Sequence, residues 1–294
     1  MSSIFRRIQC VAALAMLAST PAQAQSRFVS LGHVDLSFYE VTASLVQQTL
    51  ERLGHNVAMH KGNHSEIYPM LGSGKIDLFV AAWLPNAHGE YWKEYANQTE
   101  KVTVLYEDAR LYWSVPDYIP ATEVSSVADL LKPQVAERMQ KAIRGTRPDS
   151  GLMIGSKKIF EAYGLGDSGY ELVTGKAADW ITSFNDNIAS QRWFVMPLFQ
   201  PHFLNKVQKM RILDEPKKIF GGPDEAWMLA HKDLRKNLSK HAWGALQRMS
   251  LSIKAVTELD YLVNVRNVPP RDAARNWMAS HADTVGYWLQ GESE

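Results

Sequence analysis

The chain has 294 residues, a formal net charge of +1 and nine tryptophans. The near-zero charge excludes nucleic-acid binding by neutralisation of phosphates, which requires a strongly basic surface, and no run of like charges indicates a charged tail. The length and an apolar content of 46% suffice for one large hydrophobic core or two modest ones, and the length weakly favours two lobes.

The N-terminus has the pattern of a secretory signal peptide. Arg6 and Arg7 precede an apolar run over residues 8–17, and a small-residue stretch ends at Ala24, where we expect cleavage. The apolar run is far shorter than the roughly 20 residues of a membrane-spanning helix. Cys10, the only cysteine, lies inside this run and not at its end, so no lipid anchor is expected. We therefore expect a soluble, exported protein of the periplasm, without stable membrane insertion.

Strand and helix patterns then alternate along the chain. In the first block we predict strands over 27–32, 56–60 and 76–81 and helices over 39–53 and 65–71. After Pro116 we predict strands over 141–144, 170–173 and 192–196 and helices over 151–163 and 177–190. From Leu229 onward the chain is mostly helical, with amphipathic stretches over 234–249, 253–265 and 270–289. Such strand–helix–strand repeats predict parallel sheets covered by helices on both faces.

Aromatic and small polar residues follow several of the predicted strands. Two α/β blocks in an exported chain indicate a hinged binding protein, because a cleft between two lobes can close over a small solute. Ligands of open α/β sheets bind beyond the carboxyl ends of the strands. The segments at these ends are 35–40, 83–92, 147–153 and 198–202.

These segments resemble the glycine betaine, proline betaine and choline substrate-binding proteins of ABC transporters, the OpuAC-like family. Residues 74–92 (GKIDLFVAAWLPNAHGEYW) are similar to the family's Gly-x-x-Asp, Trp-Leu-Pro-x-x-His and Tyr segment. Residues 199–202 (FQPH) are similar to its Trp-x-Pro-His segment, with phenylalanine in place of tryptophan. Residues 148–153 resemble the start of a helix in the second lobe, and 35–43 resemble the choline-binding branch.

The resemblance implies a two-lobed periplasmic-binding-protein fold of type II, of the α/β class, with the ligand cleft between lobes joined by a two-strand hinge. After the signal peptide (1–24), we expect one lobe from residues 25–113 plus 213–294 and the other from 114–212. The hinge should cross near 113–116 and near 211–213, and the helices after Val268 should pack on the first lobe.

A quaternary ammonium group donates no hydrogen bond, so a protein recognises it by its diffuse charge and its methyl groups. Each aromatic face contributes roughly 0.5–2 kcal/mol of cation–π attraction at a desolvated site. We expect a cage of Trp83, Phe199 and Phe38, with Tyr112 or Tyr39 as a fourth wall. The alternative for each ring is an ordinary core position at the end of a strand.

Polar groups of the ligand need partners of their own. In the betaine binders that the chain resembles, a carboxylate is held by the residues matching His88 and the backbone amides of Gly151 and Leu152. The start of a helix supplies free N–H groups and a positive dipole end for such an anion, and Ser150 could add a hydroxyl. Glu40 could balance a cationic headgroup, as an acid does in the choline branch. The alternatives are a turn histidine and a helix-dipole glutamate.

The departures from the family pattern leave the solute open. Phe38 and Phe199 stand where tryptophan is expected, and Asp149 and Ser150 stand where glycine or tryptophan is expected. Glycine betaine, choline, carnitine and proline betaine all remain candidates, as does an unrelated amine. The same fold could instead bind an amino acid or a polyamine.

A secreted hydrolase is the remote alternative. The chain has no HExxH motif, no Gly-x-Ser-x-Gly elbow, no Walker loop and no dinucleotide-binding glycine pattern. We therefore expect no enzyme activity, no catalytic residue, no metal and no cofactor. The expected partners are a quaternary-ammonium ligand and an ABC transporter permease, with no nucleic acid, and the protein should be a monomer that serves transport and osmoprotection.

Overall fold

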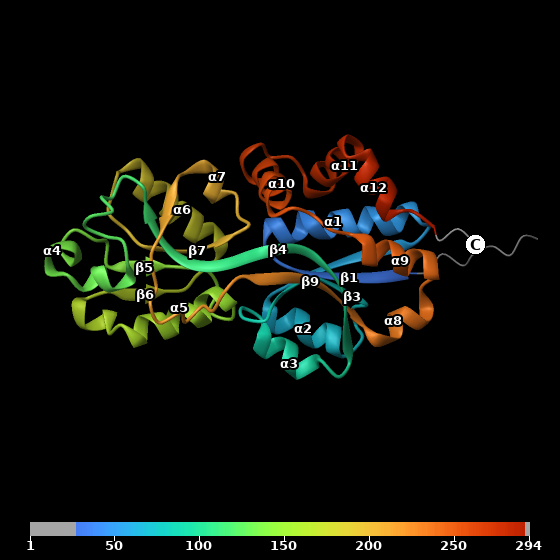
Figure 1. Cartoon of the computed structure of the whole chain (residues 1–294), viewed down its shortest axis with the longest axis horizontal. Coiled ribbons are helices and arrows are strands. Elements are labelled where there is room, and N and C mark those ends of the chain that lie inside the picture. Colours follow the sequence, from blue (N-terminus) through green and yellow to red (C-terminus); the bar gives the residue numbers. More distant parts are fainter. Residues whose placement is uncertain (1–27, 292–294) are drawn as a thin grey trace, which may run out of the picture.

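The computed structural model describes residues 28–291, so the predicted signal peptide of residues 1–24 lies outside the described residues. Figure 1 shows two α/β lobes side by side, with the long strand β4 (Thr99–Pro116) running through both. Within residues 28–291, no helix combines the length and the apolar character needed to cross a membrane.

The first lobe begins with a β–α–β alternation. Its elements up to β4 are β1 (Phe28–Val34), α1 (Ser37–Arg52), β2 (Asn56–Gly62), α2 (His64–Gly72), β3 (Leu78–Leu84) and α3 (Gly89–Tyr95). The chain returns to this lobe with β9 (Asp224–His231), α8 (Lys232–Asn237), α9 (Lys240–Arg248), α10 (Ile253–Val265), α11 (Pro270–Ser280) and α12 (Ala282–Trp288). Helices α10 and α11 pack against α1, so the C-terminal helices cover the first lobe.

The sheet of this lobe is mixed, whereas the sequence patterns predicted parallel strands. Strands β2, β1 and β3 are parallel, but β9 lies antiparallel between β3 and β4. Neither β4 nor β9 was predicted, and the expectation of helical structure from Leu229 onward is wrong for residues 229–231. A short apolar run such as 226–230 has no period that separates a buried strand from a helix.

The second lobe follows the predicted alternation closely. Its elements are the 3₁₀ helix Val127–Leu131, α4 (Pro133–Ala136), β5 (Ala142–Arg144), α5 (Gly151–Ala162), the 3₁₀ helix Leu165–Ser168, β6 (Glu171–Val173), α6 (Ala177–Ala189), β7 (Met196–Gln200), α7 (Leu204–Val207) and β8 (Met210–Ile212). The strand predicted over 192–196 begins only at Met196, so Phe199 lies within β7 and not after it. Pro197 faces Trp113 in the register and is tolerated because β7 pairs with β4 at the border of the sheet.

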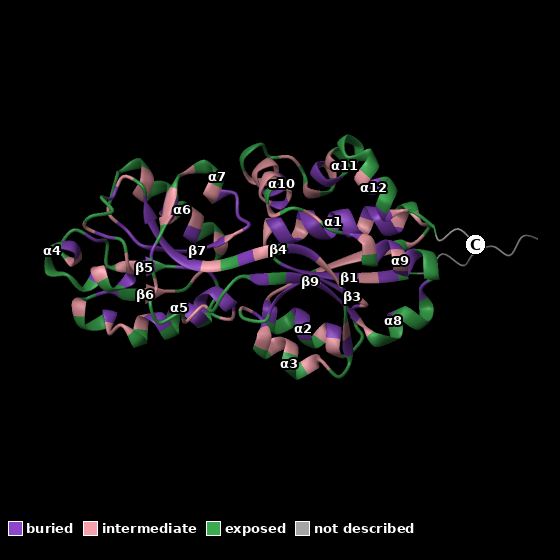
Figure 2. Cartoon of the chain, viewed as in Figure 1, coloured by how far each residue is buried: buried purple, intermediate pink, exposed green. Residues whose placement is uncertain are grey.

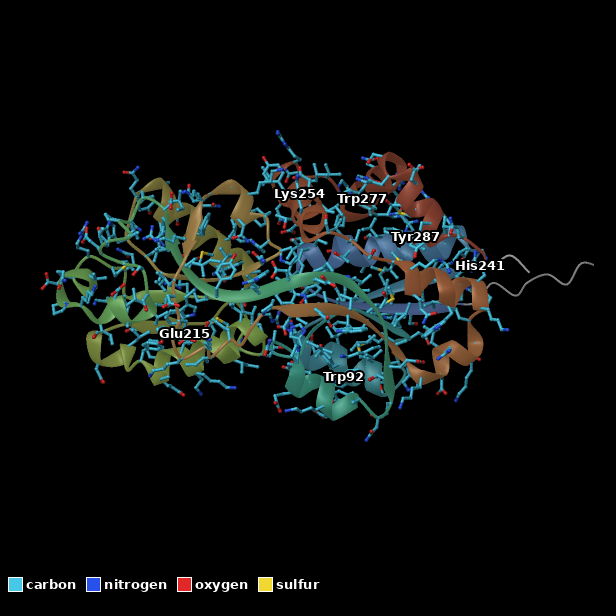
Figure 3. All side chains as sticks on the ribbon, viewed as in Figure 1. Trp92, Glu215, His241, Lys254, Trp277 and Tyr287 are labelled. Atoms are coloured by element: carbon cyan, nitrogen blue, oxygen red, sulfur yellow. The ribbon has the colours of Figure 1, made fainter. Side chains whose placement is uncertain are left out.

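Two of the predicted C-terminal helices are each divided in two. The stretch 234–249 forms α8 and α9, and Ser239 begins the second of these because its hydroxyl accepts a hydrogen bond from the backbone N–H of Ala242. The stretch 270–289 forms α11 and α12, with His281 between them. Figure 3 shows Trp277 and Tyr287 on these two helices.

The two lobes meet where β4 changes its partner. β4 pairs with β9 as far as Ala109 and Asp224, and with β7 from Arg110 and Gln200 onward. Strands β3 and β7 are almost entirely buried, whereas the helices carry both buried and exposed faces (Figure 2). The second lobe has a hydrophobic core of its own, which includes Trp113. The lobe boundaries at 113/114 and 212/213 remain a prediction.

Candidate ligand-binding site

A small apolar cavity of about 30 Å³ lies between the lobes. The first lobe contributes the starts of α1 and α2, the end of β3 and the loop that follows it, while the second lobe contributes β7 and the start of α5. β4 adds one residue from the crossing point. The lining residues are Leu36, Phe38, Tyr39, His64, Trp83, Ala87, His88, Leu111, Thr146, Ser150, Gly151, Leu152 and Phe199.

Three rings from separate segments meet at this cavity. The centroid of Phe38 lies 5.7 Å from that of Trp83 and 5.4 Å from that of Phe199, and the Trp83 and Phe199 centroids are 5.9 Å apart. Tyr39 adds a fourth ring, 6.0 Å from Trp83. All four side chains are buried. The structure therefore brings together the predicted cage residues Trp83, Phe38, Phe199 and Tyr39.

The rings are held by neighbours behind them. The indole N–H of Trp83 donates to the Tyr106 hydroxyl at 2.9 Å, which fixes the indole and leaves its faces apolar. The Phe199 ring stacks on Trp180, with centroids 5.7 Å apart and planes inclined by 12°. His202, the last residue of the FQPH segment, packs edge-on against Phe199 at 4.8 Å. These contacts preorganise the ring faces.

His88 supplies a directed polar group to the cavity. Its Nδ1 accepts the backbone N–H of Trp83 at 3.0 Å, so the neutral ring carries its proton on Nε2. Burial, followed by the nearby His64, holds the pKa of His88 well below its usual range. The ring is therefore a neutral donor and does not repel a cation.

The start of α5 lies beside the same cavity. Ser150 caps this helix by accepting the backbone N–H of Met153 at 3.2 Å, and its own hydroxyl donates to the Arg147 carbonyl at 2.8 Å. Within residues 28–291, the amides of Gly151 and Leu152 have no acceptor, as is usual for the first turn of a helix. Both residues line the cavity.

His64 also lines the cavity and was missed by the sequence analysis. Its ring centroid is 4.6 Å from that of His88, and burial lowers its pKa to about 4. The signal that marks it is the capping box of Asn63 and Glu66, which starts α2 directly after β2. A helix that starts at the carboxyl end of a strand places its first residue at the ligand-binding edge.

Tyr112 and Glu40 are not brought to the cavity. Leu111 lines it instead of Tyr112, because successive residues of a strand point to opposite faces. The Tyr112 hydroxyl donates to Asn205 at 2.8 Å on the other side of β4. Glu40 follows Tyr39 on α1 and is not among the lining residues. The aromatic cavity is consequently lined by no acidic side chain among the described residues.

Contacts beside the cavity hold the lobes together. The Tyr91 hydroxyl donates to the Asp149 carbonyl at 3.0 Å, and the Ser65 hydroxyl donates to the Asp149 carboxylate, also at 3.0 Å. A Cβ atom built on Gly151 would lie 2.5 Å from the carbonyl oxygen of Ala87. Only glycine therefore allows α5 to approach the loop after β3 this closely.

A buried carboxylate joins the lobes on another side. Asp260 of α10 accepts the Ser37 hydroxyl at 2.5 Å, the backbone N–H of Phe203 at 2.7 Å and the Asn264 amide at 2.9 Å. Ser37 precedes the cage residue Phe38, and Phe203 follows the FQPH segment. This network therefore links the two segments that carry Phe38 and Phe199.

The solved structures most relevant to this fold are solute receptors. Lactococcal OpuAC, complexed with glycine betaine in a closed conformation, has a TM-score of 0.80 at 22% identity, covering 90% of this chain and 100% of that one. The glycine betaine/L-proline-binding protein ProX of Borrelia burgdorferi has a TM-score of 0.82 at 23% identity, with coverages of 90% and 97%. A choline-binding protein in complex with choline has a TM-score of 0.79 at 17% identity, with coverages of 89% and 91%. The chain thus has the two-lobed type II periplasmic-binding-protein fold that the sequence predicted.

The sequence comparisons agree with the structural ones. The glycine betaine/carnitine transport binding protein GbuC of Listeria monocytogenes is 23% identical over 160 residues, which are 54% of this chain and 53% of that protein. The match thus spans about half the length of that relative. The OpuAC family profile, described as the substrate binding domain of an ABC-type glycine betaine transport system, matches residues 28–280. The chain belongs to this family of ABC-transporter substrate-binding proteins, as its motifs predicted.

Proposed function

We propose that this protein captures a quaternary-ammonium solute between its lobes and delivers it to an ABC importer. The observation that carries the proposal is the convergence of Trp83 and Phe38 from one lobe and Phe199 from the other on a single apolar cavity. Membership of the OpuAC family supports the same role.

The ring geometry suits an onium group. The three centroids form a nearly equilateral triangle with sides of 5.4 to 5.9 Å. A cation up to about 5 Å above the centre of this triangle stays within about 6 Å of all three rings, the range of cation–π attraction. The neutral rings of His64 and His88 add no opposing charge.

The polar side of the cavity favours a zwitterion over a bare cation. No acidic side chain of the described residues lines the aromatic cavity, so the protein offers no counter-charge there. His88 Nε2–H and the amides of Gly151 and Leu152 are donors that suit a carboxylate. Among glycine betaine, carnitine, proline betaine and choline, the three betaines fit this arrangement better.

The same role implies where the protein acts and which partner it has. A signal peptide over residues 1–24 would export the chain to the periplasm, where it would act as a monomer that docks on the permease. The cavity serves binding and not turnover. Osmoprotection is the corresponding physiology, because betaines accumulate as compatible solutes.

Calorimetric titration with glycine betaine and its uncharged-head isostere, 3,3-dimethylbutanoate, tests the recognition mode. The two ligands share shape and carboxylate, so the difference in affinity measures the attraction of the rings for the positive charge. We expect the isostere to bind at least about tenfold more weakly, from roughly 0.5–2 kcal/mol for each of three rings.

The matching variants are Trp83→Leu and Trp92→Leu. The first removes a ring of the cavity and should bring the affinities for the two ligands closer together. The second removes a half-buried tryptophan on α3 (Figure 3) that does not line the cavity, and should leave the affinities unchanged. Equal affinity of the wild type for both ligands, or tighter binding of an amino acid or a polyamine, would refute the proposal.

A further inference from the structure

Asp149, just before helix α5 of the second lobe, contacts two helices of the first lobe. Its carboxylate accepts the backbone N–H of Ser65 at 3.2 Å and the Ser65 hydroxyl at 3.0 Å, and its backbone carbonyl accepts the Tyr91 hydroxyl at 3.0 Å. Ser65 belongs to α2 and Tyr91 to α3. Asp149 stands where the family pattern has glycine or tryptophan, yet it is not among the residues that line the aromatic cavity. This departure therefore bridges the lobes and adds no group to the cavity wall.

The Asp149 carboxylate completes the start of α2 from outside the first lobe. Asn63 and Glu66 form a capping box at this helix start, within the first lobe. The backbone N–H of Ser65, in the same first turn, is instead accepted by Asp149. The positive end of the helix dipole strengthens a hydrogen bond to an anion. Burial opposes the ionised form, but the hydrogen bonds from Ser65 bring the pKa of Asp149 below its ordinary value, so the carboxylate is charged at neutral pH.

Each end of this bridge adjoins a residue of the cavity lining. Ser65 follows His64, and Asp149 precedes Ser150. The Tyr91 ring stacks on that of His64, with centroids 6.1 Å apart and planes inclined by 24°. A solute in the cavity can leave only when the lobes separate, and that separation breaks the three hydrogen bonds of Asp149 to the first lobe.

We propose that Asp149 is a positioning residue that holds the closed lobes together and thereby slows the release of the captured solute. The inference rests on the proposed function, because it requires a solute enclosed between the lobes. It requires no contact between Asp149 and that solute. Loss of the bridge should speed dissociation, which follows opening, and should leave association nearly unchanged, because association starts from separated lobes. The stability of the ligand-free, open protein should not depend on the bridge.

Stopped-flow measurement of glycine betaine binding and release, followed by tryptophan fluorescence, tests this role. Asp149→Ala should raise the dissociation rate about tenfold, because it removes two hydrogen bonds to a partly exposed carboxylate, and should change the association rate by less than about twofold. Ser65→Ala removes only the hydroxyl donor and should raise the dissociation rate about threefold. The double variant should release the ligand no faster than Asp149→Ala, because both substitutions act on one contact.

Asp129→Ala is the matched control, because Asp129 makes the same kind of contact within one lobe. Its carboxylate accepts the backbone N–H of Ser125 at 2.8 Å and the Ser125 hydroxyl at 3.1 Å. This variant should lower the melting temperature of the ligand-free protein and leave the dissociation rate unchanged. Asp149→Ala should raise the dissociation rate and leave that melting temperature unchanged.

An unchanged dissociation rate for Asp149→Ala would overturn the inference, and so would rate increases that multiply in the double variant. If the wild type binds an amino acid or a polyamine in place of glycine betaine, the proposed function fails, whereas the same rates measured with that solute still decide the role of Asp149. A wild type that binds none of these solutes contradicts both proposals.

Discussion

The Trp83 ring can border both the hydrophobic core and the candidate site because its backbone and indole N–H groups are both hydrogen-bonded to other residues. The backbone N–H is accepted by His88 at 3.0 Å and the indole N–H by Tyr106 at 2.9 Å. Burial of these groups therefore leaves no unsatisfied donor, and the ring remains available to both the core and the cavity. The sequence offered these as alternatives, whereas the structure places the ring at the border of both.

Gly151→Ala should weaken ligand binding without unfolding the protein. The added methyl group would lie 2.5 Å from the Ala87 carbonyl oxygen, so the lobes would have to separate locally. Overpacking of this kind costs about 1–3 kcal/mol, which corresponds to roughly a tenfold to hundredfold loss of affinity. Calorimetric titration measures the loss, and small-angle scattering of the liganded protein should show a less compact form.

The matched control is Gly89→Ala, because no atom lies within 4 Å of a Cβ built there. This variant should bind as the wild type does. Undiminished affinity of Gly151→Ala would show that the approach of α5 to the loop after β3 is not required for binding.

At the scale of elements, α10 joins segments that are distant in the sequence. Asp260 bonds the first residue of α1 and the backbone of the second lobe, while Lys206 of α7 pairs with Glu258 of α10. A buried carboxylate with three donors is satisfied in hydrogen bonds but still costs desolvation when charged. Burial accordingly raises the pKa of Asp260 to about 6.

This raised pKa predicts a specific pH dependence for Asp260→Asn. The unfolded chain releases the proton near its ordinary pKa of about 4. The stability that Asp260 contributes is therefore fully present below about pH 4 and is lost as the pH rises through about 6. The free energy of unfolding of the wild type, minus that of the variant, should fall by on the order of 3 kcal/mol from pH 4 to pH 7.

Urea unfolding at a series of pH values measures this difference, in which the titrations common to both proteins cancel. Asp283→Asn on the exposed side of α12 is the matched control. A difference between the wild type and Asp260→Asn that stays constant across this range would contradict the assignment.

The whole molecule buries several neutral histidines near the junction of its lobes. Burial lowers the pKa of His202 to about 3 and that of His64 to about 4, and it also lowers those of His88 and His33. In the unfolded chain each would titrate near its ordinary pKa of about 6.5. The stability they contribute is therefore present above that pH and lost as the pH falls.

We expect acid to destabilise the protein through these histidines, in the direction opposite to Asp260. Compared with His202→Gln, the wild type should lose roughly 3 kcal/mol in its free energy of unfolding from pH 6.5 to pH 4.5, because the native state cannot protonate the buried ring in this range. Thermal and urea unfolding across this range measure the difference, with the exposed His281→Gln as control. Equal pH profiles for the wild type and His202→Gln would disprove this expectation.

Local sequence was enough to predict what depends on neighbours along the chain. The alternation after Pro116 predicted α5, α6, β5 and β6 almost to the residue, because caps, turns and periodicity act within a few positions. The contact between the Trp83 backbone and His88 lies within one loop of the WLPNAH segment, so its spacing in the sequence carries the geometry.

Only the tertiary structure decided which side chains face the cavity and which sheet each strand joins. β4 and β9 pair over more than a hundred residues of separation, and neither has a local pattern that reveals its partner. Leu111 lines the cavity in place of Tyr112 because alternate side chains of β4 point to opposite faces. Glu40 is absent from the lining although Phe38 and Tyr39, its neighbours on α1, belong to it. His64 reaches the site because α2 starts at the sheet edge where the second lobe closes, a proximity that no periodicity along the chain encodes.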